Sequence, residues 1–503
     1  MRPNQQTLLS PLLSPLVPDR PPPAWLDRGA SAAGRWWLPL LLLLGALLFL
    51  PELGARPLRF EEGRRALQAW EILAGGSWWH LQVLGEPYLN KPPLLPWLMV
   101  LIGGLRGGVD EVAVRLPAVL SVLLAAVSAG AMARLLVPAR GGIAALGGGI
   151  AVLACGYVLT KARLGETDTL VTAFCGLAFL VWAWARLGDR LDWRAWAGVC
   201  LCLAAAAFTK GPIPLMFPAI PFLAVPLLQR RWGEALAALA TVLAALLPLA
   251  LWAYLNLASA DAAQWAAQMR VTGGAQKVPD WSEWLYLKRI PLGIAYTLPW
   301  FLLALPVLRD AWRRGLRDAW PELALALYAL PFGAFVLLWG EARPRYAMPA
   351  LWAIAALAGA WIGSRWGRSR LPALFLLGGL LTALVFQALV IGLVEGKTEH
   401  QRAFRARAEA LAAAVGPLPP GPVLLAYTTP WHPDFNSLAY VPRPLTRLYP
   451  EAGLCPPQGR YLLATQADRP AVEASGDWIL QQTFGEDWMA LYRRDEAACP
   501  LSG

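Results

Sequence analysis

Hydrophobic residues occur in long runs along most of the chain, separated by short polar segments. The first run, from Trp36 to Leu53, can cross a bilayer, because about 20 residues at ~1.5 Å rise span a ~30 Å core. Further runs predict spans at about 116–133, 141–159, 169–185, 193–208, 212–228, 235–258, 290–308, 323–339, 347–362 and 371–394. The run 94–105 is too short to cross, which predicts an interfacial or re-entrant helix. The pattern predicts a polytopic α-helical membrane protein with about 11–13 transmembrane helices.

Composition supports this class and excludes others. The chain has 503 residues, of which 57% are hydrophobic and 15% charged, unlike an ordinary soluble enzyme. The net charge of +11 comes from arginines in short connections such as Arg230-Arg231, which indicates membrane orientation rather than nucleic-acid binding. The sequence contains no Gly-rich phosphate loop and no dinucleotide glycine pattern, and its three histidines are too few for a zinc cage.

The polar segments suggest a domain plan. We predict a disordered cytoplasmic tail over 1–34, a membrane domain over 35–395 with its first external loop at 55–111, and a small external α/β domain over 396–503. The last domain is predicted from a helix at 401–415 and strands at 423–427, 461–465, 478–483 and 488–492. Its Cys455 and Cys499 form either a disulfide or two free thiols.

The first external loop carries candidate chemistry. Helical spacing of apolar residues predicts a helix that ends near Ala74. At its start, Glu61 can pair with Arg64 and Arg65 at i,i+3 and i,i+4, which would keep the carboxylate ionised. An ionised carboxylate at a membrane surface can act as a general base, although a surface ion pair on an interfacial helix is the alternative.

The end of the same loop holds a cation at a rigid point. Lys91 precedes Pro92-Pro93, and the double proline stiffens the chain where an apolar run begins. Lys91 would therefore project at the level of the lipid headgroups, where it could meet a phosphate. A lysine that extends its amino group to the interface without a ligand is the alternative.

The number of spans and the arginine content of the connections together place the remaining candidate residues on one side of the membrane. If 94–105 does not span, the arginine-dense connections share one side, which is then cytoplasmic. The opposite, external side holds the first loop, residues 161–168, Lys210, the loop 259–289 and residues 343–346. There Asp168 is either a helix cap or a second carboxylate facing Glu61, and the loop 259–289 is either a lid or an interfacial helix. We expect Glu61, Lys91, Asp168, Lys210 and Arg345 to surround one cavity.

Several ordered motifs resemble a known family. They are Glu61-Glu62-Gly63-Arg64, the segment 85–94 (GEPYLNKPPL), Arg115-Leu116-Pro117, Asp168 within GETDTL, Thr209-Lys210-Gly211-Pro212 and the segment 343–349 (RPRYAMP). The match covers roughly residues 36–360. The chain is similar to the glycosyltransferases of family 39, which use polyprenyl-phosphate sugars and belong to the glycosyltransferase C superfamily. This family includes the protein O-mannosyltransferases and the lipid A aminoarabinose transferases.

The resemblance implies a function and a set of site residues. The protein would transfer a sugar from a polyprenyl-phosphate donor to a lipid, glycan or protein on the external face of the bacterial inner membrane, with inversion at the anomeric carbon. Glu61, where the family usually has Asp, and Asp168 would be catalytic. The substrate-binding residues would be Glu62, Arg64, Tyr88, Lys91, Lys210, Arg343, Arg345 and Tyr346.

The sequence leaves open whether a cofactor is bound and whether the protein acts as a transporter. No cofactor is assigned, and a divalent cation between the carboxylates is an alternative, although Asn90 stands where the aminoarabinose branch has Glu. A transporter or flippase of a lipid-linked saccharide could use the same basic pocket without chemistry, but the internal repeats usual in transporters are absent from the sequence.

Overall fold

The computed structural model of the chain describes residues 23–259, 289–333, 344–426, 435–448, 453–456, 458–485, 488–495 and 497. Most of the predicted tail, the loop 260–288 and Arg343 lie outside the described residues. The chain divides into two compact units. The first comprises residues 1–51, 118–254 and 266–390, and the second comprises 52–117, 255–265 and 391–503.

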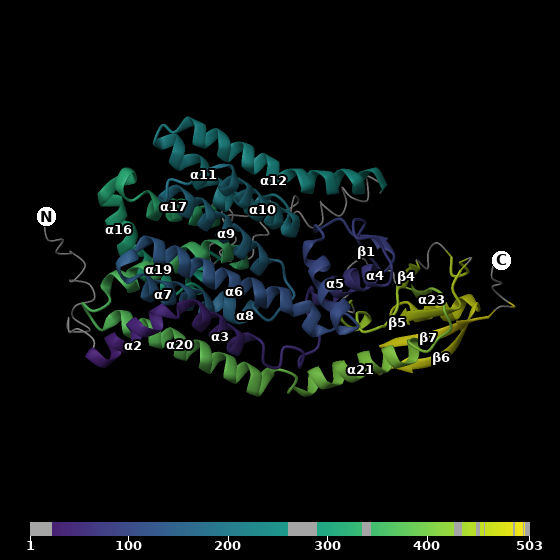
Figure 1. Ribbon diagram of the computed structural model, residues 1–503. Coiled ribbons are helices and arrows are strands. Elements are labelled where there is room, and N and C mark those ends of the chain that lie inside the picture. The colour runs from purple at the N-terminus through teal and green to yellow at the C-terminus, as the bar shows by residue number, and fades with distance from the viewer. Residues whose placement is uncertain are drawn as a thin grey trace, which may run out of the picture. The chain divides into compact units, whose positions relative to one another are not determined.

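The first unit is helical, and its core lies around α19 (Met348–Arg365). Almost every residue of α19 is buried, and it packs against α7 (Gly141–Leu153), α9 (Asp168–Leu187), α16 (Trp300–Asp318) and α17 (Trp320–Ala329) (Figure 1). The contact with α7 is very close, because a Cβ at Gly359 would lie 2.4 Å from the backbone nitrogen of Gly148. Only glycine lets these two helix backbones approach so closely.

Every predicted apolar run contains a helix, but the helices differ in length. Five described helices are long and apolar enough to cross a membrane: Glu111–Leu136, Asp168–Leu187, Trp232–Asn256, Arg345–Arg365 and Leu371–Val394. A bent pair, Asp27–Arg35 with Trp37–Phe49, raises the number to six if it is one span. The run predicted at 141–159 is divided between α7 and α8 (Gly156–Lys161), and the run at 290–308 between α15 (Arg289–Ala295) and α16. The protein is thus an integral membrane protein with several spans.

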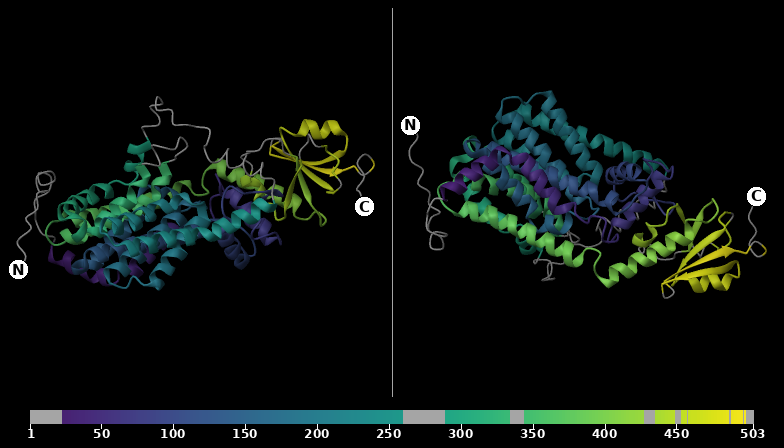
Figure 2. Two further views of the ribbon diagram at one scale, coloured as in Figure 1. Left: turned by 90° about the horizontal axis from the view of Figure 1, so that it is seen from above. Right: turned by 60° about the horizontal axis from the view of Figure 1, so that its bottom comes forward.

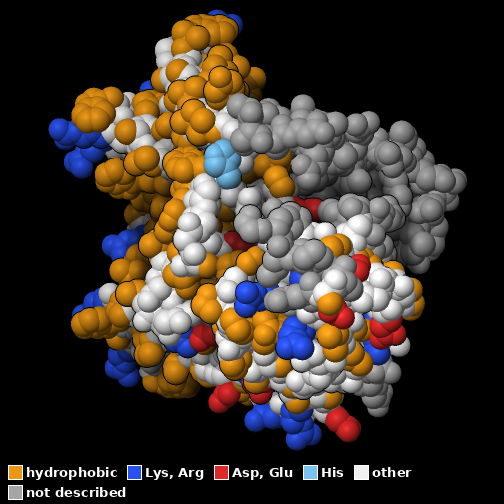
Figure 3. Space-filling view, turned by 90° about the vertical axis from the view of Figure 1, so that its right-hand side faces the viewer, with side chains coloured by type: hydrophobic (Ala, Val, Ile, Leu, Met, Phe, Trp, Pro, Cys, Tyr) orange, Lys and Arg blue, Asp and Glu red, His pale blue; other side chains and the backbone are white. Residues whose placement is uncertain are grey.

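The surface also has the character of a membrane protein. Leu374, Leu377 and Leu381 of α20 (Leu371–Leu389) are exposed, as are Leu243 and Leu247 of α12 (Trp232–Ser259). Hydrophobic side chains likewise cover much of the face shown in Figure 3. In water such extended apolar surface would be costly, whereas lipid tails cover it without penalty.

The second unit contains the first loop and the C-terminal segment. The loop folds into α4 (Glu62–Leu73), the hairpin β1 (Gln82–Val83) and β2 (Glu86–Pro87), and α5 (Leu94–Arg106). With 13 residues, α5 is as short as predicted. The C-terminal segment begins with α21 (Glu399–Val415), at the position predicted for a helix.

A five-stranded sheet follows α21 (Figure 2). Its strand order is β4-β3-β5-β7-β6. The strands are β3 (Val423–Ala426), β4 (Leu445–Leu448), β5 (Tyr461–Thr465), β6 (Trp478–Phe484) and β7 (Met489–Arg494). β3 runs parallel to β4 and β5, whereas β7 is antiparallel to β5 and β6. Leu462, Val472, Trp478 and Tyr492 form its core, with α23 (Arg469–Ser475) packed on β5 and β6. The four predicted strands are present, and β4 was not predicted.

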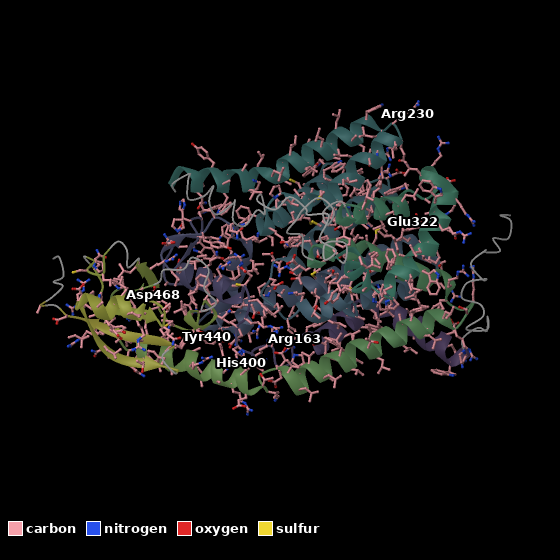
Figure 4. The ribbon with its side chains drawn as sticks, turned by 180° about the vertical axis from the view of Figure 1, so that it is seen from behind. Arg163, Arg230, Glu322, His400, Tyr440 and Asp468 are labelled. Carbon is pink, nitrogen blue, oxygen red and sulfur yellow. The ribbon has the colours of Figure 1, made fainter. Side chains whose placement is uncertain are left out.

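The C-terminal segment is bonded to the first loop rather than separate from it. The Tyr440 hydroxyl, labelled in Figure 4, donates to Glu111 at 2.7 Å and accepts the Leu58 N–H at 2.9 Å. Arg405 also donates to Glu111, at 2.7 Å. The predicted boundary at 396 therefore separates chain segments that share one unit. In the same segment Cys455 is disulfide-bonded, and Cys499 lies outside the described residues.

Candidate active site

In the first unit, Asp168 and Lys210 meet at the ends of two neighbouring helices. Asp168 is the first residue of α9, and Lys210 is the last residue of α10 (Trp193–Lys210). α10 ends there because Gly211 takes a positive φ of 89° and Pro212 follows. The Lys210 ammonium group donates a hydrogen bond to the Asp168 carboxylate, whose side chain is only 5% exposed.

Arg345 and Tyr346 join this pair from the short helix η3 (Pro344–Ala347). The Arg345 Nε atom lies 3.7 Å from Oδ2 of Asp168. The Lys210 ammonium group lies 4.2 Å from the centre of the Tyr346 ring, within the range of a cation–π interaction. Four residues predicted from distant motifs are therefore brought together.

The structure adds Lys161 and Glu166, which were not among the predicted site residues. Glu166 accepts hydrogen bonds from Lys161 at 3.2 Å and from Arg345 at 3.0 Å. With Asp168 and Lys210 these described side chains carry three positive and two negative charges. We call these five residues the cation cluster. The sequence signal was the density of charge in the segment 161–168 between two apolar runs.

The helix-cap alternative for Asp168 is wrong. Thr167 occupies the N-cap position of α9, and the helix has no side-chain cap hydrogen bond. Asp168 lies in the first turn, where a negative charge still favours the helix dipole. Its carboxylate instead binds Lys210 and lies near Arg345, so it holds the cations in place.

Arg163, labelled in Figure 4, lies beside the cluster in sequence but has another role. Its guanidinium donates to the carbonyl oxygens of Phe49 at 3.0 Å and Pro51 at 2.6 Å. These carbonyls lie at and just beyond the end of α3 (Trp37–Phe49), where backbone acceptors lack helical partners. Arg163 therefore fixes the end of the first apolar helix.

In the second unit, Glu61 is the residue immediately before α4. Its side chain is 40% exposed and forms an ion pair with Arg64 at 2.9 Å, which confirms the predicted i,i+3 contact. The predicted i,i+4 pair with Arg65 is wrong. Arg65 instead donates to Gln68 at 3.2 Å and lies over the Tyr88 ring at 5.3 Å, because its side chain points into the buried side of α4.

Glu62 differs completely from its neighbour Glu61. Its side chain is fully buried, and its two oxygens accept from Arg115 at 2.8 and 2.9 Å. Arg115 also donates to the carbonyl oxygens of Leu53, Arg56 and Pro57. The described contacts of Glu62 are therefore structural: the pair fixes the loop that leads into α4. Direct substrate binding by Glu62 stays a prediction.

Tyr88 and Lys91 lie at the other end of the loop. The Tyr88 ring is buried beneath Arg64, whose guanidinium carbon lies 5.9 Å from the ring centre. The Tyr88 hydroxyl is buried without a hydrogen-bond partner among the described residues. Lys91 precedes α5, and its amino group lies 3.5 Å from the side-chain oxygen of Asn90.

Trp78 and Trp79 of the loop pack on Trp97 of α5. The Trp97 indole N–H donates to the Trp78 carbonyl oxygen at 2.6 Å, and the Trp79 and Trp97 rings meet edge to face at 5.2 Å. Trp78 and Trp79 remain partly exposed. Among the described residues, no group of three or more His, Cys, Asp or Glu side chains is arranged to hold a metal ion.

Solved structures with this architecture identify the fold. The apo crystal structure of ArnT from Cupriavidus metallidurans covers 93% of this chain and 99% of its own, with a TM-score of 0.66 at 17% sequence identity. This chain has the ArnT fold. The structure of the same ArnT bound to undecaprenyl phosphate matches equally, with a TM-score of 0.66 at 18% identity.

Sequence comparison leads to the same kind of protein. The family model described as dolichyl-phosphate-mannose-protein mannosyltransferase matches residues 90–254. An undecaprenyl phosphate-alpha-4-amino-4-deoxy-L-arabinose arabinosyl transferase 1 of Pseudomonas fluorescens is 30% identical over 70% of this chain and 65% of the relative. An undecaprenyl phosphate-alpha-4-amino-4-deoxy-L-arabinose arabinosyl transferase of Pseudomonas aeruginosa is 32% identical over 64% of this chain. That alignment spans 58% of the relative's length. The chain thus resembles the aminoarabinose transferase type in sequence and in fold, as predicted.

Proposed function

We propose that this protein is a membrane glycosyltransferase that moves a sugar from a polyprenyl-phosphate donor to an acceptor hydroxyl or phosphate. The observation that carries the proposal is the cation cluster, in which Lys161, Lys210 and Arg345 surround two carboxylates. Charges at the ends of apolar helices are costly unless they serve a partner or a substrate. The relatives are named for undecaprenyl-phosphate sugars, which supports a lipid-linked donor.

The chemistry requires cations where the leaving group forms. The acceptor O–H gives its proton to a base, and its oxygen forms a bond to the anomeric carbon from the face opposite the leaving group. The bond from that carbon to the phosphate oxygen breaks, and its electron pair leaves with the polyprenyl phosphate. Arg345 can contact two phosphate oxygens with its planar guanidinium, and Lys210 adds a point charge. Both would stabilise the negative charge that develops as the bond breaks.

Glu61 is the proposed base. It is a partly exposed carboxylate paired with Arg64, so it can reach an acceptor while it stays ionised. Asp168 is the second proposed catalytic carboxylate, which would position substrate through the cations it binds. Glu61 and Asp168 belong to different units, and the resemblance to the family is what supports their joint action.

The remaining predicted residues complete the proposed binding site. Arg64, Lys91, Tyr346 and the buried Tyr88 hydroxyl are the proposed contacts to donor or acceptor. Arg343 keeps its proposed phosphate-binding role and lies outside the described residues. By the charge parity of the connections, we place the site on the external side of the inner membrane.

An assay in proteoliposomes separates a transferase from a flippase. The purified protein would be given a panel of labelled undecaprenyl-phosphate pentoses and hexoses, together with an envelope extract as the source of acceptor. We expect labelled product and release of undecaprenyl phosphate. Movement of intact donor between leaflets, with neither product nor released undecaprenyl phosphate, would contradict the proposal and identify a flippase.

A further inference from the structure

The start of α4 lacks a cap from its own sequence. The first N–H groups of a helix need acceptors, and Ser, Thr, Asp or Asn at the N-cap position usually supplies one. Here Glu61 occupies that position, and its side chain accepts no N–H of the helix. Its carboxylate is bound to Arg64 instead.

A residue from the C-terminal segment supplies the missing acceptor. Oδ1 of Asn436 accepts the Gly63 N–H at 2.9 Å, although the two residues are 373 positions apart. Nδ2 of Asn436 donates to the Phe60 carbonyl oxygen at 3.4 Å. Asn436 therefore bonds the chain on both sides of Glu61, and it satisfies an N–H group that an N-cap side chain would normally accept.

The fit between the two segments is close. Asn436 lies in the short helix α22 (Phe435–Leu438), which packs directly on α4. A Cβ at Gly63 would lie 2.5 Å from the backbone of both Phe435 and Asn436, so only glycine permits this approach. The Phe435 ring also lies under Arg64, with its centre 5.0 Å from the guanidinium carbon.

We propose that Asn436 is a positioning residue. From a distant part of the same chain it caps α4, and so it holds Glu61 and Arg64 in place for the reaction. Because Asn436 accepts the Gly63 N–H, the Glu61 carboxylate does not have to turn back to cap its own helix. It stays paired with Arg64 and available to an acceptor. The C-terminal segment thereby acts in the reaction through α4. This inference rests on the proposed base role of Glu61.

Hydrogen exchange tests the cap itself without any turnover. Asn436→Ala in the full-length purified protein should raise amide exchange in the first turn of α4 by roughly 2- to 30-fold, the effect of losing a helix cap. Asn436→Asp keeps the acceptor and should restore most of the protection. Gln481→Ala, an exposed residue of β6, is the matched control and should leave exchange unchanged. Unchanged exchange in Asn436→Ala would overturn the proposal.

Kinetics test whether the cap positions the base. With the labelled undecaprenyl-phosphate sugars and envelope extract described above, Asn436→Ala should lower kcat by a similar factor, leave KM for the donor within about twofold, and be rescued by Asn436→Asp. In a Glu61→Gln background the same substitution should have little further effect on kcat. Equal losses in both backgrounds, or exchange that rises while kcat stays unchanged, would overturn it. If the wild type shows no transfer at all, the proposed function fails, while the exchange experiment still reports on the cap.

Discussion

Adjacent residues of like charge have different roles at the start of α4. Glu61 is partly exposed and pairs with Arg64, whereas Glu62 is fully buried against Arg115. Helical spacing predicted the first contact because the two residues are three positions apart. It could not predict the second, because Arg115 is 53 positions from Glu62 and is brought close only by tertiary folding.

Glu62→Gln should strongly destabilise the second unit. Removing one partner of a buried ion pair leaves the other charge uncompensated, which costs about 3–5 kcal/mol. We expect a clearly lower thermal midpoint in detergent for Glu62→Gln than for the wild type. Glu409→Gln, at an exposed position of α21, is the control and should unfold at the wild-type temperature. A wild-type midpoint for Glu62→Gln would contradict the structural role of the pair.

At the scale of elements, the cation cluster forms where helices end. Asp168 starts α9, Lys210 ends α10 and Arg345 lies in η3 just before α19. Counting the apolar runs predicted that these ends share one side of the membrane, and Asp168, Lys210 and Arg345 do lie together. Glu166 was not predicted as a site residue, because its role depends on hydrogen bonds from Lys161 and Arg345. No local spacing predicts the bond from Arg345, which is 179 positions away.

Lys210→Met should weaken binding of the lipid phosphate. The substitution removes a cation that bonds to charged groups, and such bonds contribute about 1.5–3 kcal/mol each. We expect affinity for undecaprenyl phosphate, measured by native mass spectrometry, to fall roughly 10- to 100-fold. Lys397→Met, at an exposed position outside the cluster, should bind like the wild type. Equal affinity of the two variants would remove Lys210 from the site.

Glu71 gives the contact between α4 and the β1–β2 hairpin a dependence on pH. Its Oε1 accepts the Gly85 N–H at 3.3 Å, its Oε2 is buried without a partner among the described residues, and burial raises the pKa of Glu71 to about 7. The folded state therefore holds this proton more tightly than the unfolded state, where the pKa is near 4.5. Its stabilising contribution is complete below pH 4.5 and is lost as pH rises through about 7.

Glu71→Gln mimics the protonated carboxyl and should remove this dependence. Near pH 4.5 the variant and the wild type should unfold at similar temperatures, whereas at pH 8 the variant should be the more stable by up to roughly 3 kcal/mol. Thermal midpoints measured across this pH range check the prediction. A difference between the two proteins that does not change with pH would contradict it.

At the scale of the whole molecule, the sequence predicted the class of fold, whereas the predicted domain boundaries stay a prediction. The apolar runs became helices because their length and composition leave no alternative in lipid. The boundary at 396 was predicted from a change to polar composition, yet Tyr440 and Arg405 bind Glu111, and both segments lie in one unit. A change in composition indicates where the chain leaves the membrane. It does not predict that the C-terminal segment contacts the first loop.

Orientation is a further property of the whole molecule. The charge parity predicts that Glu61 and Asp168 face the same, external side. Cysteines at the exposed positions Phe60 and Thr160 should both react with a membrane-impermeant maleimide added to intact cells, in a background without the native free cysteines. Labelling of either position only after the cells are opened would place it on the cytoplasmic side and contradict the proposed site.

In the proposed reaction a polyprenyl phosphate leaves as the sugar is transferred, with Glu61 as the base. Mass spectrometry of one reaction mixture can count both products. We predict one undecaprenyl phosphate released for each labelled sugar on the acceptor, and a rate at least about 100-fold lower for Glu61→Gln, as expected for loss of a general base. Full transfer by Glu61→Gln, or labelled product formed without release of undecaprenyl phosphate, would contradict the account.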